Sequence, residues 1–155
     1  MAELSDYQYS VLLTFRTALR EFLHWSAAQA EAAGLTPQQH QLLLAVRGHV
    51  GELPPSVGEV ARYLLLRHHS AVGLINRVVA AGLVERKVDP TDQRVMRVSL
   101  TDRGNDVIEK LSAATLAELE HVAEQLGISE ELLEQLARQF AESLTGQPIA
   151  TRDIG

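Results

Sequence analysis

Residues 56–101 read SVGEVARYLLLRHHSAVGLINRVVAAGLVERKVDPTDQRVMRVSLT, and their pattern is the most informative in the chain. It opens with a capping box, in which Ser56 and Glu59 stand three positions apart at the start of a short helix. The apolar residues that follow recur at helical spacing. A turn of about three residues near 65–67 leads to a second helix, which ends at Gly82. The first half of the stretch therefore predicts two helices joined by a short turn.

The second half of the stretch predicts a β-hairpin. Residues 83–88 and 94–100 are short and rich in β-branched side chains, which favour strands. Residues 89–93 between them read DPTDQ, and proline and aspartate favour a turn. Thr101 and Asp102 then begin another helix, because a threonine cap and an acidic first turn stabilise a helix N-terminus.

Longer helices flank this stretch on both sides. Capping boxes at Ser5 and Thr36 begin two helices, and we expect the second of them to run to about residue 50. The spacing of apolar residues predicts two more helices after the hairpin, divided at Gly127. The chain is thus expected to form a single domain over residues 1–155, mainly α-helical with a small β-hairpin.

The outer helices carry apolar faces that the middle of the chain is too small to cover. These helices lie in residues 1–34 and 102–145, on either side of a lobe formed by residues 36–101, and the tail from Gly146 is expected to fray. Two copies that bury the apolar faces against each other would form a two-fold homodimer. The alternative is that the terminal helices cover only each other within one chain. We favour the homodimer because the apolar faces are long at both ends.

The composition excludes several classes of protein. No apolar run approaches the roughly 20 residues that span a bilayer, and residues 1–10 lack a secretory signal, so we expect a cytoplasmic protein without membrane contact. The absence of cysteine excludes disulfides, thiolate metal sites and cysteine-based redox sensing. The sequence also lacks a phosphate-cradling glycine loop, a nucleophile elbow and a metallohydrolase helix, so we do not expect an enzyme.

The charge is distributed unevenly. The net charge is −6, yet residues 56–101 hold seven basic and four acidic groups, so this segment carries +3 and the remainder −9. A basic segment on an acidic body steers one face toward phosphate. The alternative is a chance fluctuation, and the charge distribution alone favours neither interpretation.

The second helix of the stretch carries the candidate base-contacting residues. Small and polar side chains near its start suit insertion into the DNA major groove. Arg67, His68 and His69 can donate hydrogen bonds to guanine, and Ser70 can donate or accept. Gly73 costs about 1 kcal/mol in an exposed helix, which indicates either a close backbone approach or simple tolerance.

The hairpin carries a second set of candidates. Arg94 follows the turn and can enter the narrow minor groove, while Asp92 two residues earlier can hold its guanidinium group. Arg86 and Lys87 on the preceding strand would lie near phosphates. The alternative for Asp92 and Arg94 is an ordinary surface ion pair, worth under about 1 kcal/mol.

Together these motifs resemble the multiple antibiotic resistance regulator (MarR) family of bacterial transcription factors. The resemblance is carried by VGEVA at 57–61, INR at 75–77, AGLVER at 81–86, DPTDQR at 89–94, VSLT at 98–101 with Gly104, and LTP at 35–37. It implies a winged helix-turn-helix fold flanked by dimerisation helices, and an obligate homodimer. Two recognition helices would enter successive major grooves of a near-palindromic operator, with the wings in flanking minor grooves.

The function predicted from this resemblance is a sequence-specific regulator that binds double-stranded DNA and acts as a repressor. The predicted DNA-contact residues are Ser56, Arg67, His68, His69, Ser70, Gly73, Arg77, Arg86, Lys87, Asp92 and Arg94. Three departures from the family pattern affect the expected target. Leu65 stands where the family often has glycine, Arg67 replaces the usual Ser or Thr cap, and His68, His69 and Gly73 are unusual on the base-contacting face. The operator sequence therefore does not carry over.

The resemblance further implies a small aromatic or anionic effector that releases the protein from DNA, and no cofactor. Its predicted contacts are Arg16, Arg20, Trp25, His40 and Arg47, each of which could instead be an ordinary surface or core-edge residue. No metal site is expected, because His68 and His69 diverge by about 100° on a helix and the other histidines lack ligand spacing. Protonation of His68 or His69 would add charge beside DNA, so affinity should rise as pH falls from about 8 to 6.

A protein-binding module that uses the winged helix without DNA is the remaining alternative. Salt dependence distinguishes the two, because a DNA binder with about six phosphate contacts loses roughly 10³ in affinity between about 50 and 200 mM salt.

Overall fold

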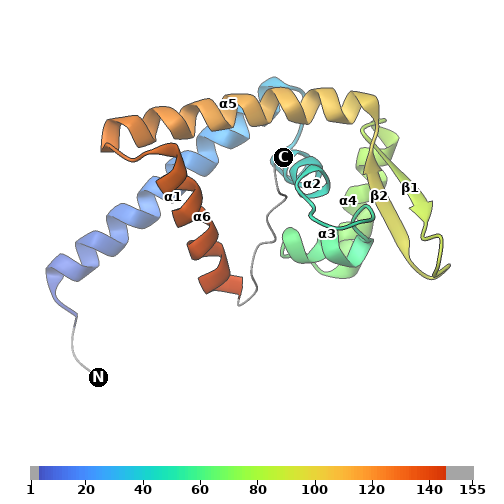
Figure 1. Cartoon of the computed structure of the whole chain (residues 1–155), viewed down its shortest axis with the longest axis horizontal. Helices are drawn as coiled ribbons and strands as arrows, with labels where there is room; N and C mark the ends of the chain where they lie inside the picture. Colours follow the sequence, from blue (N-terminus) through green and yellow to red (C-terminus); the bar gives the residue numbers. More distant parts are fainter. Residues whose placement is uncertain (1–3, 146–155) are drawn as a thin grey trace.

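The computed structural model describes residues 4–145. The elements are α1 (Asp6–Ala32), α2 (Pro37–Arg47), α3 (Val57–Tyr63), α4 (His68–Ala80), β1 (Val84–Val88), β2 (Met96–Leu100), α5 (Asp102–Leu126) and α6 (Glu130–Thr145). The strands lie with α2, α3 and α4 in one lobe, and α5 runs from this lobe to α1 and α6 (Figure 1). The predicted fold class, mainly α-helical with a small antiparallel hairpin, is confirmed.

The helices begin where the capping residues predict. Ser5, Thr36 and Ser56 each form a complete capping box with the glutamine or glutamate three residues on. Thr101 caps α5 by accepting a hydrogen bond from the Gly104 N–H at 3.1 Å. The predicted end of α2 near residue 50 is wrong: the helix stops at Arg47. Gly48 closes it, and the following segment, rich in glycine and proline, cannot continue a helix.

The core fills the lobe that contains the hairpin. The largest fully buried apolar side chains in it come from α2, α3, α4, β2 and the first turns of α5, namely Leu42, Leu43, Val60, Leu74, Ile75, Val78, Val98 and Ile108. Gly104, in the first turn of α5, lies so close to the Leu83 carbonyl that a Cβ atom would overlap it. The glycine therefore lets α5 start directly against the base of the hairpin.

The hairpin is shorter than predicted and gains a third backbone partner. β1 and β2 pair from Val84 opposite Leu100 to Val88 opposite Met96, because the turn takes up all residues from Asp89 to Val95. The chain before α3 also lies along β2, where the Val98 N–H donates to the Pro55 carbonyl at 2.9 Å. This bond fixes the hairpin to the segment that precedes the helix-turn-helix.

The turn between α3 and α4 contains the one non-glycine residue with a positive φ among residues 4–145. Leu65 has φ 53°, the left-handed conformation that glycine adopts without penalty, and its side chain is 93% exposed. The Leu66 N–H donates to the Ala61 carbonyl at 2.9 Å, so the turn closes in the usual way despite the leucine.

We expect Leu65→Gly to raise the free energy of unfolding by about 0.5 to 1 kcal/mol, because the relief of left-handed strain exceeds the added entropy of the unfolded chain. Urea unfolding followed by circular dichroism measures this. Leu65→Ala keeps a Cβ atom and therefore the strain, so it should stay within about 0.5 kcal/mol of the parent. A less stable glycine variant would show that Leu65 contributes a contact.

The terminal helices leave an apolar surface exposed. Phe15 and Phe140 meet edge to face with ring centroids 6.5 Å apart, so α1 and α6 do contact each other within the chain. A groove of about 510 Å³ nevertheless stays open between them, lined mainly by Phe15, Leu19, Leu133, Leu136, Ala137 and Phe140. We call this the α1/α6 groove. Further apolar side chains on α1 are also exposed, among them Val11, Leu12 and Leu23.

Among residues 4–145, no helix combines the length and the apolarity that a bilayer span requires.

Candidate nucleic-acid interface

The start of α4 presents the predicted base-contacting residues to solvent. Arg67 is the N-cap residue, with extended backbone, and within residues 4–145 its side chain makes no capping bond. The guanidinium is therefore not needed to hold the helix. His68 and His69 in the first turn are exposed, and Ser70 is half-buried behind them. These side chains form an exposed polar end on a helix whose opposite face lies in the core.

Gly73 lies one turn further along α4 and is half-buried. A Cβ atom built there would meet only the Arg77 guanidinium, at 3.8 Å. No neighbour within the described chain therefore requires glycine at this position. Close packing within the protein therefore does not explain Gly73. Either the helix simply tolerates a glycine here, or an external molecule approaches the backbone closely at this position.

The wing tip holds the predicted pair of Asp92 and Arg94. The Arg94 Nε and Nη2 atoms each lie 3.1 Å from an Asp92 carboxylate oxygen, and the Arg94 backbone N–H donates to Oδ1 at 3.0 Å. These bonds lower the pKa of the Asp92 carboxyl and raise that of Arg94. The Arg94 side chain is 90% exposed, so it stays available to a ligand while its direction is set by Asp92.

A buried carboxylate, Asp89, organises the turn behind that tip. Its Oδ1 accepts hydrogen bonds from the Thr91 hydroxyl and N–H, both at 2.8 Å, and from the Asp92 N–H at 3.0 Å. Its Oδ2 accepts from the Arg97 Nε at 2.7 Å. The Asp89 side chain is only 2% exposed, and the bonds from Thr91 and then Arg97 hold its pKa far below the usual value.

Arg97 connects the wing to the helix-turn-helix. Besides Asp89, its Nη1 contacts the Pro54 carbonyl at 3.1 Å and the Glu59 carboxylate at 3.3 Å. Glu59 in turn accepts the Ser56 N–H in the capping box of α3. One guanidinium group thus joins the wing turn, the chain before α3 and the first turn of α3. From the sequence alone, Arg97 was one of seven basic residues in this segment, and nothing marked it as a structural residue rather than a phosphate contact.

We expect the stability advantage of the parent over Asp89→Asn to depend on pH. Because the folded-state pKa of Asp89 is depressed, its contribution is fully present above the unfolded value of about 3.9 and is lost as pH falls toward the folded value. The gap in free energy of unfolding should therefore be constant near pH 7 and shrink below about pH 4. Urea titrations at several pH values measure it, with the exposed Asp106→Asn as the charge-matched control. A gap that does not change with pH would contradict the assignment.

A small cleft lies between the start of α4 and the wing. It measures about 190 Å³ and is lined by Val57, His68, Val72, Ile75, Arg86, Arg94 and Met96. Arg86 is held there by a 2.6 Å hydrogen bond from its Nη1 to the Asn76 Oδ1 on α4. Two arginines and a histidine therefore line this cleft together with apolar side chains, and arginine side chains commonly bind phosphate groups.

Other predicted contacts lie outside this cleft. Lys87 on β1 forms an exposed ion pair with Glu85 at 2.6 Å, and Arg77 is exposed on α4. The Ser56 hydroxyl is committed to capping α3, where it accepts the Glu59 N–H at 3.2 Å. Ser56 can therefore contact a phosphate only by donating its hydroxyl hydrogen. The structure brings His68, Arg86 and Arg94 together in the cleft. Lys87, Arg77 and Ser56 do not line it.

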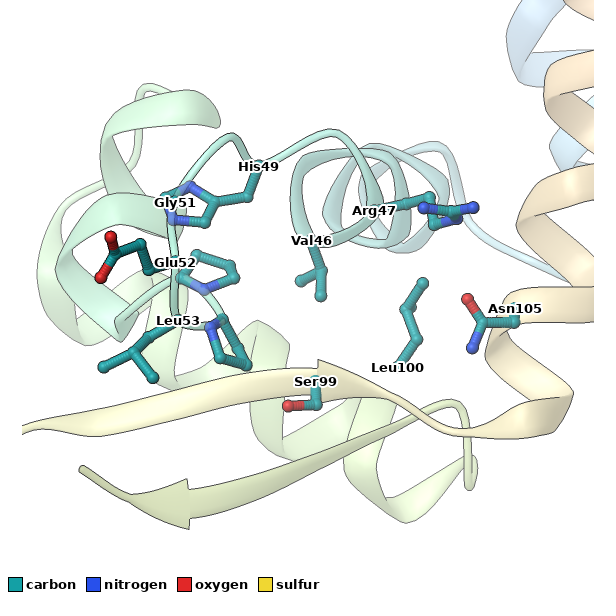
Figure 2. A pocket seen from close by; sticks show the side chains of 11 residues that line it. Val46, Arg47, His49, Gly51, Glu52, Leu53, Ser99, Leu100 and Asn105 are labelled. Carbon is teal, nitrogen blue, oxygen red and sulfur yellow. The ribbon is translucent and has the colours of Figure 1, made fainter. Parts of the chain in front are cut away.

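The five predicted effector contacts do not converge on one cavity. Arg16 and Arg20 are exposed on α1, and Trp25 is half-buried and stacks on Phe22 with ring centroids 6.2 Å apart. His40 is buried in α2, where loss of solvent lowers its pKa. Arg47 alone of the five lines the cavity of about 290 Å³ shown in Figure 2. Among residues 4–145, no group of three metal-ligating side chains is placed to hold an ion.

The middle of the chain matches a known protein family. A family model described as the MarR family matches residues 33–95, from the C-cap of α1 to the wing turn. The chain is therefore similar to the MarR family over this segment. The transcriptional activatory protein BadR of Rhodopseudomonas palustris is 37% identical over 91 residues, 58% of this chain and 52% of that protein. The match thus spans about half the length of BadR.

Solved structures share the fold over nearly the whole chain. AbsC, a MarR family transcriptional regulator from Streptomyces coelicolor, has a TM-score of 0.75 at 22% identity, covering 95% of this chain and 100% of AbsC. NadR in complex with 4-hydroxyphenylacetate gives 0.74 at 22% identity over 95% and 100% of the chains. A point mutant of MepR from S. aureus, bound to an oligodeoxyribonucleotide, gives 0.60 at 22% identity over 93% and 99%. At this identity the likeness shows the fold alone.

Proposed function

We propose that this chain is a member of the MarR family, a sequence-specific transcription regulator that binds double-stranded DNA as a homodimer. The exposed first turn of α4 beside the Arg94–Asp92 pair carries the proposal. An α-helix fits the major groove, and an arginine held at a wing tip fits the narrow, negatively charged minor groove beside it. The relative MepR, whose mutant was solved with an oligodeoxyribonucleotide, supports the same partner for this chain.

Within this arrangement the predicted residues have different tasks. Arg67, His68, His69, Ser70 and Gly73 face the base edges, where good bidentate contacts discriminate by about 1 to 3 kcal/mol. Arg86 and Lys87 bind phosphates, as do Arg77 and Ser56 at the margins of the interface. Arg94 enters the minor groove and Asp92 orients it.

The α1/α6 groove supports the homodimer. Burial of exposed side chains such as Phe15, Leu19 and Phe140 against a second copy removes apolar surface from water on both protomers. A two-fold dimer places two copies of α4 about one helical turn of DNA apart. The operator is therefore near-palindromic, with half-sites about 10 base pairs apart.

The proposed regulatory effect is repression, released by a small aromatic or anionic effector. A dimer that covers two half-sites blocks access of other proteins to the same DNA. The complex of NadR with 4-hydroxyphenylacetate supports an effector of this chemical class. Since BadR is named an activatory protein, a promoter fusion with and without the regulator is the measurement that decides the direction.

Selection of bound duplexes from a random library tests the proposal. The parent should enrich a near-palindromic sequence, and its affinity should fall by roughly 10³ between about 50 and 200 mM salt. A protein-binding module without DNA would enrich nothing.

We expect His69→Ala to change the enriched bases rather than abolish binding, because an exposed base-facing side chain discriminates by about 1 to 3 kcal/mol. Parallel selections with the parent and the variant measure this change. His24→Ala, on α1, is the matched control and should leave the enriched sequence unchanged. Identical sequences from the parent and His69→Ala would remove His69 from the base-contacting set.

A further inference from the structure

Arg86 lies on the face of the hairpin that packs against the core side of α4. It pairs across the sheet with the fully buried Val98, and residues that pair across two strands share a face. Alternation along β1 places the buried Val84 on that face too, and Lys87 on the opposite one. The register of the hairpin therefore explains why Arg86 lines the cleft between α4 and the wing and Lys87 does not.

The partner that holds Arg86 is a neutral amide. The Arg86 Nη1 donates a hydrogen bond to the Asn76 Oδ1 at 2.6 Å, and Asn76 is exposed on α4. Among the described residues, Arg86 has no carboxylate partner. Other basic residues of the segment 56–101 do contact carboxylates, which offset their charge, namely Arg62, Lys87, Arg94 and Arg97. The Arg86 guanidinium is thus held in place while it keeps its full positive charge.

The same bond limits what Asn76 itself can contact. An asparagine that recognises adenine accepts a hydrogen bond through its Oδ1 and donates one through its amide nitrogen. Here the Oδ1 already accepts from a guanidinium group, which is charged and therefore a stronger donor than the amino group of adenine. Asn76 is consequently better suited to orienting Arg86 than to contacting a base.

A guanidinium group that is both fixed and uncompensated suits a phosphate. Its planar set of donors matches the oxygens of a phosphate group, and His68 and Arg94 line the same cleft. An aspartate in place of Asn76 would also hold Arg86, but its charge would offset that of the guanidinium and repel the phosphate. An alanine would leave the charge and lose the hold. Among these three residues, only asparagine meets both requirements.

We propose that Asn76 is a positioning residue, which holds Arg86 in the cleft for a backbone phosphate of DNA without neutralising it. The DNA half of this proposal rests on the proposed function and deepens it by naming the group that orients a phosphate contact. Asn76 and Arg86 are both exposed, so substitutions there spare the core.

The positioning half is tested in the free protein. NMR relaxation gives the order parameter of the Arg86 Nε–H bond, which should be about 0.8 in the parent and fall below about 0.6 in Asn76→Ala. Asn76→Asp keeps an acceptor and should keep the parent value. Asn105→Asp, the same chemical change at an exposed position of α5 outside the cleft, is the matched control. An unchanged order parameter in Asn76→Ala would overturn the positioning half.

The DNA half is tested by gel-shift titrations with the selected operator at several salt concentrations. Asn76→Ala frees Arg86 but leaves its charge, so affinity should fall about 3- to 10-fold with the salt slope of the parent. Asn76→Asp should bind at least about tenfold more weakly at about 50 mM salt, with a slope lower by about 2, one unit for each protomer of the proposed dimer. Asn105→Asp should match the parent in both measurements.

A double substitution shows whether Asn76 acts through Arg86. In a protein that carries Arg86→Gln, the further change Asn76→Ala should leave the affinity for the operator unaltered. Additive losses would mean that Asn76 contacts DNA by itself, and a changed sequence in selections with Asn76→Ala would mean that it contacts a base. Either result, or the parent salt slope in Asn76→Asp, would overturn the DNA half.

Failure of the proposed function would look different. If the parent bound no DNA while the order parameters changed as expected, the proposed function and the DNA half would fail together and the positioning of Arg86 would stand. If the parent bound its operator while Asn76→Ala left the Arg86 order parameter unchanged, the proposed function would stand and the role of Asn76 would fail.

Discussion

Leu19→Glu is expected to make the protein monomeric. Operator binding should then weaken by roughly 10³ or more, because a monomer binds one half-site with one recognition helix and loses the gain from binding two half-sites at once. Leu19 lines the α1/α6 groove and is exposed within a single chain, so the substitution spares the hairpin lobe and its core. A carboxylate buried between two copies would lose its hydration without a partner. The substitution is therefore expected to be costly only if the groove is buried in the proposed dimer.

Sedimentation measures the oligomeric state of Leu19→Glu, and a gel-shift titration measures its affinity for the operator. Thr17→Glu is the matched control, because it adds the same charge to an exposed position of α1 that does not line the groove. Circular dichroism should show the parent helix content in both variants. A dimeric Leu19→Glu with parent affinity would show that the groove faces solvent in the working protein.

Arg94→Ala is expected to weaken binding to every duplex by about 10- to 100-fold and to lower the salt slope by about 2, one unit for each wing of the dimer. The side chain is exposed at the wing tip, and the Asp92 carboxylate that directs it would then face the negatively charged groove alone. Both effects act in the same direction. The selected sequence should change little, because minor-groove contacts discriminate bases poorly.

Gel shifts at several salt concentrations measure the affinity and the slope. Arg94→Lys keeps the charge but cannot reproduce the two parallel bonds to Asp92, so its salt slope should match the parent while its affinity falls part of the way. Unchanged affinity in Arg94→Ala would remove the wing tip from the interface. An altered sequence preference would instead make it a direct base contact.

Much of the fold follows from short-range patterns in the sequence. The capping boxes at Ser5, Thr36 and Ser56 formed as predicted, and the Asp92–Arg94 pair formed across two residues. The end of α2 was misplaced because apolar spacing continues beyond Arg47, whereas Gly48 ends the backbone hydrogen bonding. The left-handed conformation of Leu65 was likewise hidden, since leucine carries no signal for a positive φ.

In the candidate interface, too, local features could be predicted from the sequence and contacts between distant residues could not. The side chains at the start of α4 could be chosen from the sequence, because the helix pattern alone decides which of them face away from the core. The bond between Asn76 and Arg86 could not, since it joins a helix to a strand. Arg97 looked like one more basic residue of the segment, and its distant partners show it to be the connection between the wing and α3.

The order of helices and hairpin, their caps and the wing-tip pair could all be predicted from the sequence, because they depend on hydrogen bonds between residues a few positions apart. Only the tertiary structure decided three further features: the link from Arg97 to Asp89, Glu59 and Pro54, the cavity beside Arg47, and the exposed α1/α6 groove. Each joins segments far apart in the chain. Their meeting depends on the path of the backbone and on packing, which local spacing does not encode.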